Sequence, residues 1–379
     1  MPNKKITIFF CGGHLSPALA VMEKLDKNKY EIIYIGRKQS QEGDPGRSFE
    51  ESVIRKMKIP YLNLITGRLQ RSLTRYTLVS LIKFPVGLIQ SFYLLLKYKP
   101  VLVVSFGGYV SLPVCLAAKL LGKKIVIHEQ THALGLTNKI VAKIADKVFL
   151  SWPDTKNITG SGKTVVTGNP VRSSIFRTCR EDQGLLAFGD QKLPLLCVVG
   201  GSQGARSINM IIIKAVPQLA KKFRILHQCG SANKNHDFKV SLSIKNSLPA
   251  ATRKNYFPVK QINPEDIGAI FQKAELIVSR AGANTVAEIA ISGTPAILIP
   301  LPWSAEGEQE ANAKMLAATG LAKILPQKPL SAKILLGEIL DMWRDRLNYI
   351  NCRPKARELY PPTSADKIAA AIEEIIKIA

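Results

Sequence analysis

Residues 279–313 read SRAGANTVAEIAISGTPAILIPLPWSAEGEQEANA, and this stretch decides the fold. A short apolar strand, Leu276–Val278, runs into the small residues of Arg280–Ala283 and then into a helix that carries Glu288 in its first turns. A second strand, Ala296–Pro300, ends in a polar loop and another helix. Small residues between a strand and a helix allow a ligand's phosphate to meet backbone N–H groups at the helix start. The stretch therefore predicts an α/β unit that binds a phosphorylated ligand.

The same alternation of strands and helices extends over the chain of 379 residues, which is long enough for two domains. Strands are predicted, among other places, at Lys5–Phe10, Tyr30–Ile35, Val101–Ser105, Lys124–His128, Leu195–Val199 and Arg224–Gln228, and a surface loop at 38–53. Such alternation forms a parallel sheet with helices on both faces, and the pattern restarts after Gly168-Asn169-Pro170. We expect an α/β fold of two doubly wound, Rossmann-like domains. The N-terminal domain spans 1–166, the C-terminal domain spans 167–361, and a last helix at 362–379 packs back on the first.

Composition narrows the class of protein without deciding its ligand. A formal charge of +25 favours phosphorylated ligands, nucleic acid or an anionic membrane surface, although a high lysine content with solvated faces explains it equally well. The six cysteines are scattered without a CxxC pair and are typical of buried thiols in a reducing compartment. The N-terminal residues lead directly into a strand, so we expect no signal peptide.

A basic and apolar segment interrupts the N-terminal pattern. Arg68, Arg71 and Arg75 precede the apolar run 76–99, in which Lys83 and Pro85 sit near the middle. The run approaches the length of a membrane span, but it lies inside a continuous α/β pattern. We therefore expect helices that lie at a membrane interface or pack in the core, and not a transmembrane helix.

Two motifs resemble well-known sites but lack the required context. His128-Glu129-Gln130-Thr131-His132 has the H-E-x-x-H spacing of a zinc protease, yet His128 ends a strand, whereas the zinc motif needs a helix. Gly160–Thr164 resembles the end of a phosphate-binding P-loop, but position 157 is Asn and a strand follows. We expect neither a metal site nor a P-loop.

Three glycine-containing turns follow apolar strands, at Gly12-Gly13, Gly107-Gly108 and Gly200–Gly204. Glycine permits positive φ and close approach of the backbone, so such turns can hold a diphosphate, although each alone is more typical of a tight turn. Glu288 is similarly ambiguous from its spacing. It could accept hydrogen bonds from both hydroxyls of a ribose, or it could simply oppose the dipole of its helix.

Taken together, these motifs resemble one family. The chain carries GGSQGAR at 200–206, GNPVR at 168–172, HEQ at 128–130, GLTNK at 135–139, and RAGA at 280–283 followed by Glu288. In this order they resemble the MurG family of bacterial hexosyltransferases, over nearly the whole chain. Members move GlcNAc from UDP-GlcNAc to the MurNAc 4-hydroxyl of undecaprenyl-pyrophosphoryl-MurNAc-pentapeptide (lipid I). The product is lipid II, which serves peptidoglycan synthesis, cell shape and division.

The resemblance implies a glycosyltransferase B fold with the active site in a cleft between the two domains. It implies donor-binding roles for Arg172, Ser202, Gln203, Gly204, Ala283, Asn284, Glu288, Gln309 and Asn312. It implies acceptor-binding roles for Gly12, Gly13, His14, Gly107, Gly108, Tyr109, Thr131 and Asn138. The expected partners are UDP-GlcNAc, lipid I and the anionic cytoplasmic face of the inner membrane, with no nucleic acid, cofactor or metal.

The reaction implied is an inverting displacement in which a base takes the proton of the acceptor hydroxyl. His14 is the candidate for this base, because imidazole titrates near neutral pH, and Glu129 is a second catalytic candidate. The first glycine loop lacks the family's usual GGTGGH pattern, Thr131-His132 replaces its usual Asn, and the loop before Gln309 is acidic. These departures affect the acceptor site more than the nucleotide site.

Other functions share parts of this pattern. A related lipid glycosyltransferase, for instance one acting on diacylglycerol, has the same donor half, and a nucleotide-sugar epimerase has the same two-domain architecture. A basic nucleic-acid-binding module would explain the charge, but the sequence carries no recognition motif for one. Acceptor assays distinguish the first two alternatives, and the salt dependence of DNA affinity tests the third.

Overall fold

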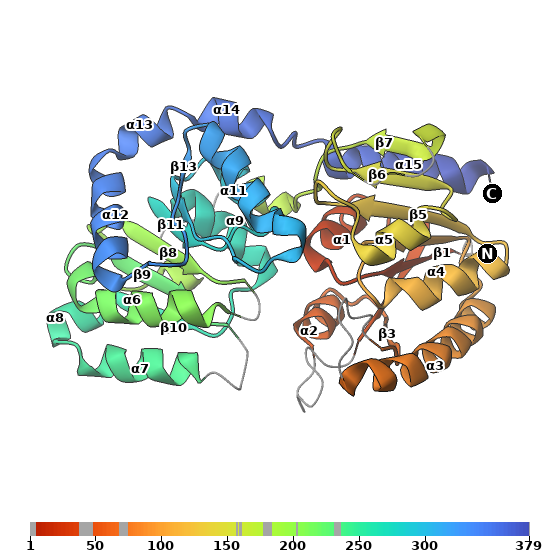
Figure 1. Cartoon of the computed structure of the whole chain (residues 1–379), viewed down its shortest axis with the longest axis horizontal. Helices are drawn as coiled ribbons and strands as arrows, with labels where there is room; N and C mark the ends of the chain where they lie inside the picture. Colours follow the sequence, from red (N-terminus) through yellow and green to blue (C-terminus); the bar gives the residue numbers. More distant parts are fainter. Residues whose placement is uncertain are drawn as a thin grey trace. The chain divides into compact units, whose positions relative to one another are not determined.

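The computed structural model describes residues 5–37, 48–67, 75–156, 158, 161–176, 184–201, 204–230 and 236–378. The chain divides into two compact units, of which one comprises Met1–Arg172 with Pro362–Ala379 and the other Ser173–Pro361. Each unit is a parallel sheet with helices on both faces (Figure 1).

The N-terminal sheet holds seven strands among the described residues, all parallel, in the order β3-β2-β1-β4-β5-β6-β7. They are β1 (Ile6–Cys11), β2 (Tyr30–Gly36), β3 (Tyr61–Asn63), β4 (Leu102–Ser105), β5 (Lys124–Glu129), β6 (Lys147–Leu150) and β7 (Thr164–Val166). The central strands are almost continuously apolar because helices cover both faces of the sheet.

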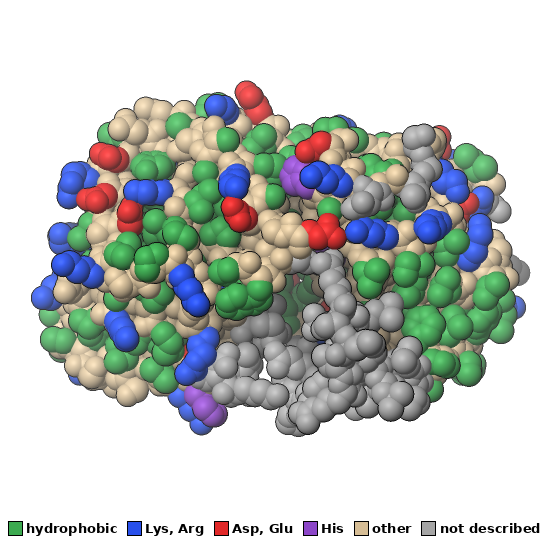
Figure 2. All heavy atoms as spheres, in the orientation of Figure 1, with side chains coloured by type: hydrophobic (Ala, Val, Ile, Leu, Met, Phe, Trp, Pro, Cys, Tyr) green, Lys and Arg blue, Asp and Glu red, His purple; other side chains and the backbone are tan. Residues whose placement is uncertain are grey.

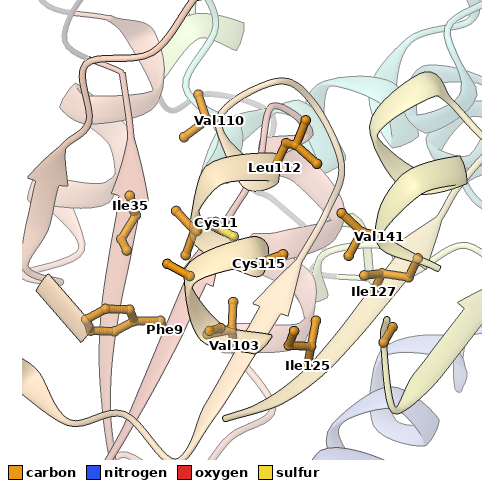
Figure 3. Packing of buried hydrophobic residues seen from close by; sticks show 14 of the residues in the cluster. Phe9, Cys11, Ile35, Val103, Val110, Leu112, Cys115, Ile125, Ile127 and Val141 are labelled. Carbon is orange, nitrogen blue, oxygen red and sulfur yellow. The ribbon is translucent and has the colours of Figure 1, made fainter. Parts of the chain in front are cut away.

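Alternate residues of β1 serve the two faces of this sheet. Phe9 and Cys11 pack with α3 (Arg75–Tyr98), α4 (Ser111–Leu120) and α5 (Leu136–Val141), and Figure 3 shows part of this layer. Ile8 and Phe10 pack on the other face with α1 (Leu15–Met22), α2 (Phe49–Lys56) and α15 (Ser364–Ile378). The last helix of the chain therefore completes the core of the N-terminal unit.

The N-terminal unit ends at Arg172, whereas the sequence predicts a boundary at residue 166. Thr167 and Gly168 donate their backbone N–H groups to Leu150 O, at 2.9 and 3.2 Å, and so continue the pairing beyond β7. The short 3₁₀ helix η2 (Ser173–Phe176) then packs on α9 (Pro264–Lys273) in the C-terminal unit. Hydrogen bonding thus joins Gly168, the first residue of GNPVR, to the first unit.

The C-terminal sheet holds six parallel strands among the described residues, in the order β10-β9-β8-β11-β12-β13. They are β8 (Leu195–Val199), β9 (Arg224–Gln228), β10 (Tyr256–Val259), β11 (Leu276–Ser279), β12 (Ala296–Leu298) and β13 (Ala322–Ile324). The remaining helices are α6 (Arg206–Leu219), α7 (Asp237–Ser247), α8 (Ala250–Arg253), α10 (Ala283–Ser292), α11 (Glu308–Ala318), α12 (Ala332–Arg344), α13 (Arg346–Ile350) and α14 (Arg353–Glu358). The strand order matches that of the Rossmann fold.

The surface loop predicted over 38–53 is wrong at its C-terminal end. The loop predicted over 38–53 gives way to α2 at Phe49, because Ser48 caps the helix by accepting a hydrogen bond from Glu51 N at 3.1 Å. Ser48-Phe49-Glu50-Glu51 is a capping-box sequence, a signal that could have revealed the helix. The short strand β3 was also not predicted, and residues 38–47 lie outside the described part of the chain.

The apolar run 76–99 forms most of the long helix α3, with Pro85 inside it. Leu94 and Leu95 are buried against the sheet and α4, as a core-packing helix requires. None of the helices in the described part of the chain combines the length and hydropathy that a bilayer crossing needs. Arg68 and Arg71 lie outside the described residues.

Candidate active site

Each sheet reverses its strand order at one place, and the glycine loops lie there. In the N-terminal sheet the reversal separates β1 from β4, and in the C-terminal sheet it separates β8 from β11. At such a reversal the loops after the two adjacent strands diverge and leave a crevice beyond the carboxyl ends of the strands. The loops concerned are Gly12–His14 and Gly107–Tyr109 in one unit, and Gly200–Gly204 and Arg280–Ala283 in the other.

The two N-terminal loops lie backbone against backbone. Gly13 N donates to Gly107 O at 2.9 Å, and a Cβ on Gly12 would lie 2.9 Å from that same oxygen. Gly108 has φ +81°, and a Cβ there would lie 3.0 Å from Gly13 N. At positions 12 and 108, both the backbone conformation and the close approach of neighbouring atoms require glycine. The predicted acceptor-binding residues of these two loops are therefore brought together.

His14 precedes α1 as its N-cap residue and makes no capping hydrogen bond through its side chain. Its Nδ1 lies 2.8 Å from Nε2 of Gln130, which follows β5. Close neighbours desolvate the imidazole and lower the pKa of His14 more than the charge of Glu129 raises it, although His14 is an exposed residue. The imidazole is therefore neutral near pH 7, as a base must be before it accepts a proton.

Glu129 organises the loop that follows β5. One carboxylate oxygen accepts hydrogen bonds from the backbone N–H and hydroxyl of Thr131, at 3.1 and 2.8 Å. The other accepts from Gly135 N and Asn138 Nδ2, both at 2.9 Å. Asn138 also lies against Gly107, whose Cβ position is 3.2 Å from Asn138 Nδ2. With both oxygens occupied and only 4% of its surface exposed, Glu129 has the environment of a structural carboxylate.

A positively charged residue outside the predicted site, Arg37, lies beside the second glycine loop. Arg37 follows β2 and donates from Nη1 to Tyr109 Oη at 2.8 Å. Tyr34, on β2 itself, donates its hydroxyl to Gly12 O at 3.0 Å. Burial raises the pKa of the nearby Glu50 to about 7, although the neighbouring hydroxyl of Tyr34 and the charge of Arg37 oppose this shift. Arg37 and Tyr34 were missed because only the strand order brings them to these loops.

In the C-terminal unit, hydrogen bonds hold the described residues of the loop after β8. Gly204 N donates to Gly201 O at 2.9 Å, and Gln228 Nε2 donates to the same oxygen at 2.9 Å. Gly204 has φ +81°, and a Cβ there would lie 2.1 Å from Cys229 O. The loop leads into α6. The predicted donor residues Ser202 and Gln203 lie outside the described residues.

The helix α10 begins next to this loop, since β8 and β11 are adjacent. Its N-cap is Gly282, with φ −66° and ψ 142°, and neither a capping side chain nor an acidic residue occupies its first turn. A Cβ built on Gly282 meets no atom within 4 Å, so neither backbone conformation nor packing requires glycine there. Ala283 and Asn284 form the first turn and are half-buried, while Glu288 is 6% exposed.

The following helix, α11, packs on α10 and contributes the remaining donor candidates. Asn312 donates from Nδ2 to Ala281 O at 3.1 Å, and Gln309 Oε1 accepts from Leu301 N at 3.0 Å. Arg280 is buried and donates to Ile299 O, Pro300 O, Ser207 Oγ and Gln327 Oε1 at 2.6–3.1 Å. These contacts fix the turn between β11 and α10. Arg172, also predicted as a donor residue, is buried in the N-terminal unit.

Comparisons with known proteins agree with this geometry. Residues 11–150 match the glycosyltransferase family 28 N-terminal domain, and residues 195–371 match the C-terminal domain of that family. A Treponema denticola protein is 34% identical, with 87% of this chain and 85% of the relative covered. A Syntrophus aciditrophicus protein is 35% identical, with 88% and 87% covered. Both are named UDP-N-acetylglucosamine–N-acetylmuramyl-(pentapeptide) pyrophosphoryl-undecaprenol N-acetylglucosamine transferase.

Among solved structures, Acinetobacter baumannii MurG is 26% identical, covers 98% of this chain and 100% of its own, and superposes with a TM-score of 0.64. The chain belongs to the MurG family. The predicted glycosyltransferase fold and the predicted hexosyltransferase class are thereby confirmed.

Two of the three departures from the MurG pattern fall on the N-terminal unit, and the acidic loop before Gln309 belongs to the C-terminal unit. Thr131, which stands where the family usually has Asn, binds Glu129 and so remains part of the loop's hydrogen bonding. His132 stacks on Trp152 with ring centroids 4.6 Å apart and lies 3.0 Å from Asp154 Oδ1. His128 and Glu129 both belong to β5, which confirms that H-E-x-x-H here is no helical zinc motif. The described residues contain no group of three or more His, Cys, Asp or Glu side chains arranged to hold a metal.

Proposed function

We propose that this chain transfers GlcNAc from UDP-GlcNAc to the MurNAc 4-hydroxyl of undecaprenyl-pyrophosphoryl-MurNAc-pentapeptide, which yields lipid II. The observation that carries this proposal is the identity of 30–35% over most of the chain with relatives named for that reaction. The positions of the glycine loops at both strand reversals support it, because both substrates contain a diphosphate that such loops can bind.

The donor binds to the C-terminal unit in this proposal. The UDP diphosphate lies against backbone N–H groups at the start of α10 and in the Gly200–Gly204 loop. Glu288 accepts hydrogen bonds from the ribose hydroxyls, and its burial makes such charge-assisted bonds strong. Gln309 and Asn312, with Ala283 and Asn284, read the GlcNAc. Arg172, Ser202 and Gln203 contact the diphosphate by resemblance to the family.

The lipid acceptor binds to the N-terminal unit. Its diphosphate lies at Gly12-Gly13 and Gly107-Gly108, where Arg37 and Tyr109 add a cation and a hydroxyl. Asn138 and Thr131 keep these loops in place through Glu129. Glu129 thus has a positioning role in this proposal, and His14 is left as the base.

Chemically, the reaction is a displacement with inversion at the anomeric carbon. The MurNAc 4-hydroxyl oxygen bonds to that carbon while His14 takes its proton, and the bond from the anomeric carbon to the UDP oxygen breaks. The departing diphosphate gains negative charge, which helix N-termini stabilise. Because these groups are part of the protein, we expect turnover to persist in excess EDTA.

The membrane partner is proposed from α3. Its exposed face carries Val86, Ile89, Tyr93 and Leu96, whose side chains are 45–70% exposed and recur at helical spacing. Figure 2 shows hydrophobic side chains gathered where α3 lies in Figure 1. Lys97 lies above the rings of Tyr93 and Tyr98 and adds positive charge beside this face. We propose that it docks the enzyme peripherally on the anionic cytoplasmic face of the cell membrane.

Vesicle binding tests the docking face. The double variant Ile89→Asp/Leu96→Asp should partition onto anionic vesicles at least about tenfold more weakly, since each removes an exposed apolar side chain from the interface. Leu347→Asp is the matched control, because Leu347 is 64% exposed in the C-terminal unit. Equal partitioning of the double variant and the wild type would exclude this face as the membrane contact.

Turnover tests the function itself. The purified chain is incubated with UDP-GlcNAc, or other UDP-sugars, and a lipid I analogue, and UDP release and the glycosylated lipid are measured. We expect UDP release only with the acceptor present and a preference for UDP-GlcNAc. Conversion of the nucleotide-sugar without acceptor would favour an epimerase, and turnover with diacylglycerol instead of lipid I would favour the other lipid glycosyltransferases. A chain that shows no preference for UDP-GlcNAc would contradict the proposal.

A further inference from the structure

Gln130 and His14 form a side-chain pair that the proposed mechanism does not yet explain. Gln130 Nε2 lies 2.8 Å from His14 Nδ1, although the two residues are 116 positions apart in the chain. Trp152 Nε1 donates to Gln130 O at 3.3 Å and holds the backbone, and Gln130 is only 7% exposed. The amide is therefore held against one particular nitrogen of the imidazole.

The atom that Gln130 presents decides which nitrogen of neutral His14 carries the proton. An amide N–H that points at Nδ1 requires Nδ1 to accept, so the ring proton resides on Nε2. In that tautomer Nε2 has no free lone pair and cannot take a proton from a substrate hydroxyl. Rotation of the amide by 180° exchanges its two terminal atoms and reverses the requirement: Oε1 then accepts from Nδ1–H, and Nε2 becomes the free acceptor.

The requirements of proton transfer decide between the two orientations. Gln130 Oε1 is buried and has no hydrogen-bond partner among the described residues, and rotation would place the amide NH2 group in that same position. Either orientation therefore leaves one end of the amide unpaired, and only the rotated one pairs Oε1 with Nδ1–H and leaves Nε2 of His14 able to accept a proton. The charged groups that act on His14 from the adjoining strand β5 are Glu129 and, when protonated, His128. Neither of them is hydrogen-bonded to His14 Nδ1 in the described part of the chain, so Gln130 is the tautomer-setting partner there.

We propose that Gln130 is a positioning residue for the transfer reaction, because its Oε1 holds His14 in the Nδ1–H tautomer and leaves Nε2 free as the base. The inference rests on the proposed function. The MurNAc hydroxyl proton passes to Nε2 as the oxygen bonds to the anomeric carbon, and the electron pair of the broken glycosyl bond leaves on UDP. The imidazolium then donates from Nδ1 to Oε1, which stabilises the positive charge that develops.

The tautomer is measured directly by long-range ¹H–¹⁵N NMR on the full chain, which contains only five histidines, so His14→Ala assigns the signal. With UDP and a lipid I analogue bound, we expect neutral His14 of the wild type to be the Nδ1–H tautomer. Gln130→Met, which retains length but removes the acceptor, should return it to the Nε2–H tautomer that imidazole prefers in water. An Nε2–H tautomer in the wild-type complex would overturn the proposal, whatever the activity.

Steady-state kinetics of Gln130 variants is the second test of the proposal. Gln130→Met should lower kcat by about 10²-fold or more, the usual contribution of a general base, while the KM for UDP-GlcNAc changes less than about twofold. Gln130→Glu keeps an acceptor oxygen, so it should retain more activity than Gln130→Met, and its charge should move the acid limb of the kcat–pH profile up by about one unit. Exposed Gln218 provides the control, since Gln218→Met should change neither quantity.

The two tests separate failure of this inference from failure of the proposed function. A wild type that does not glycosylate lipid I would refute the function, while the NMR measurement still decides the pairing. A wild type that turns over normally, with Gln130→Met as active as Gln218→Met, would overturn the positioning role alone. If His14→Ala is as active as the wild type, His14 is not the base and the inference fails with it.

Discussion

The substitution Gly282→Ala tests whether the start of α10 binds the donor phosphate. The backbone of Gly282, with φ −66° and ψ 142°, is accessible to any residue, and an added Cβ meets no atom within 4 Å. Folding therefore gives no reason for glycine there. At an N-cap, Ala is less favourable than Gly by about 0.5–1 kcal/mol, whereas restricting the unfolded chain recovers about 0.4–1 kcal/mol. The two effects cancel to within about 1 kcal/mol, so the Tm should shift by less than about 4 °C.

Donor binding should change much more than stability. The added methyl occupies the space in which a phosphate oxygen would approach the helix N–H groups. Loss of hydrogen bonds to a charged group costs about 1.5–3 kcal/mol, which raises the KM for UDP-GlcNAc by roughly 10- to 150-fold. Steady-state kinetics at saturating acceptor measures this, and calorimetric titration with UDP checks the affinity.

Gly337→Ala is the matched control, since a Cβ on Gly337 also meets no atom within 4 Å, but Gly337 lies inside α12. It should raise stability by about 0.5–1 kcal/mol through helix propensity and leave the KM unchanged. If Gly282→Ala also leaves the KM within about twofold of the wild type, the start of α10 does not bind the diphosphate and the proposed donor orientation is wrong.

Three further perturbations test separate parts of the molecule. Glu288→Gln should raise the KM for UDP-GlcNAc by about 10- to 150-fold through the lost charge-assisted bonds to ribose, whereas Glu310→Gln, on the exposed side of α11, should not. Arg37→Gln should raise the KM for the lipid acceptor by about tenfold with little change for UDP-GlcNAc, and the opposite pattern would remove Arg37 from the acceptor site. Burial lowers the pKa of His227 to about 3, so the unfolded chain binds this proton first as the pH falls. Stability should therefore be lost between about pH 6.5 and 3, by up to ~1.4 kcal/mol per pH unit, and chemical denaturation of His227→Gln should show a shallower loss.

The elements that position the site were predictable because their signals are local. Val101–Ser105 and Leu195–Val199 are continuous apolar runs that end at glycines, and both form central strands. The H-E-x-x-H at 128–132 could be dismissed as a zinc site for the same reason, since the strand predicted at Lys124–His128 is visible in the sequence, and β5 extends it by one residue. Where the prediction was wrong, at α2, a local capping signal was present but was outweighed by the Gly and Pro residues before it.

The partners of the site residues were not predictable, because strand order rather than sequence spacing decides them. Arg37 reaches Tyr109 across 72 positions, and Gln130 reaches His14 across 116. Residues at the ends of β1, β2, β4 and β5 meet only after the sheet adopts the order β2-β1-β4-β5. The HEQ motif identifies Gln130 as part of a family pattern. Only the strand order brings its amide within hydrogen-bonding distance of His14.

In the proposed function, the two units use the same strand reversal for different chemical tasks. Both place glycine loops after the two central strands, where backbone N–H groups can bind a diphosphate regardless of what it is attached to. The side chains around the loops differ between the two units, and they determine which other chemical groups each unit can bind. Beside the N-terminal loops lie the imidazole of His14 and the guanidinium of Arg37. The imidazole suits proton transfer, and the guanidinium suits binding of the acceptor diphosphate. The C-terminal loops bring small residues and the buried carboxylate of Glu288, which suit close approach of a nucleotide and its ribose hydroxyls. In the proposed reaction the base lies with the substrate that carries the reacting hydroxyl, and His14, beside the N-terminal glycine loops, is the residue proposed for that role.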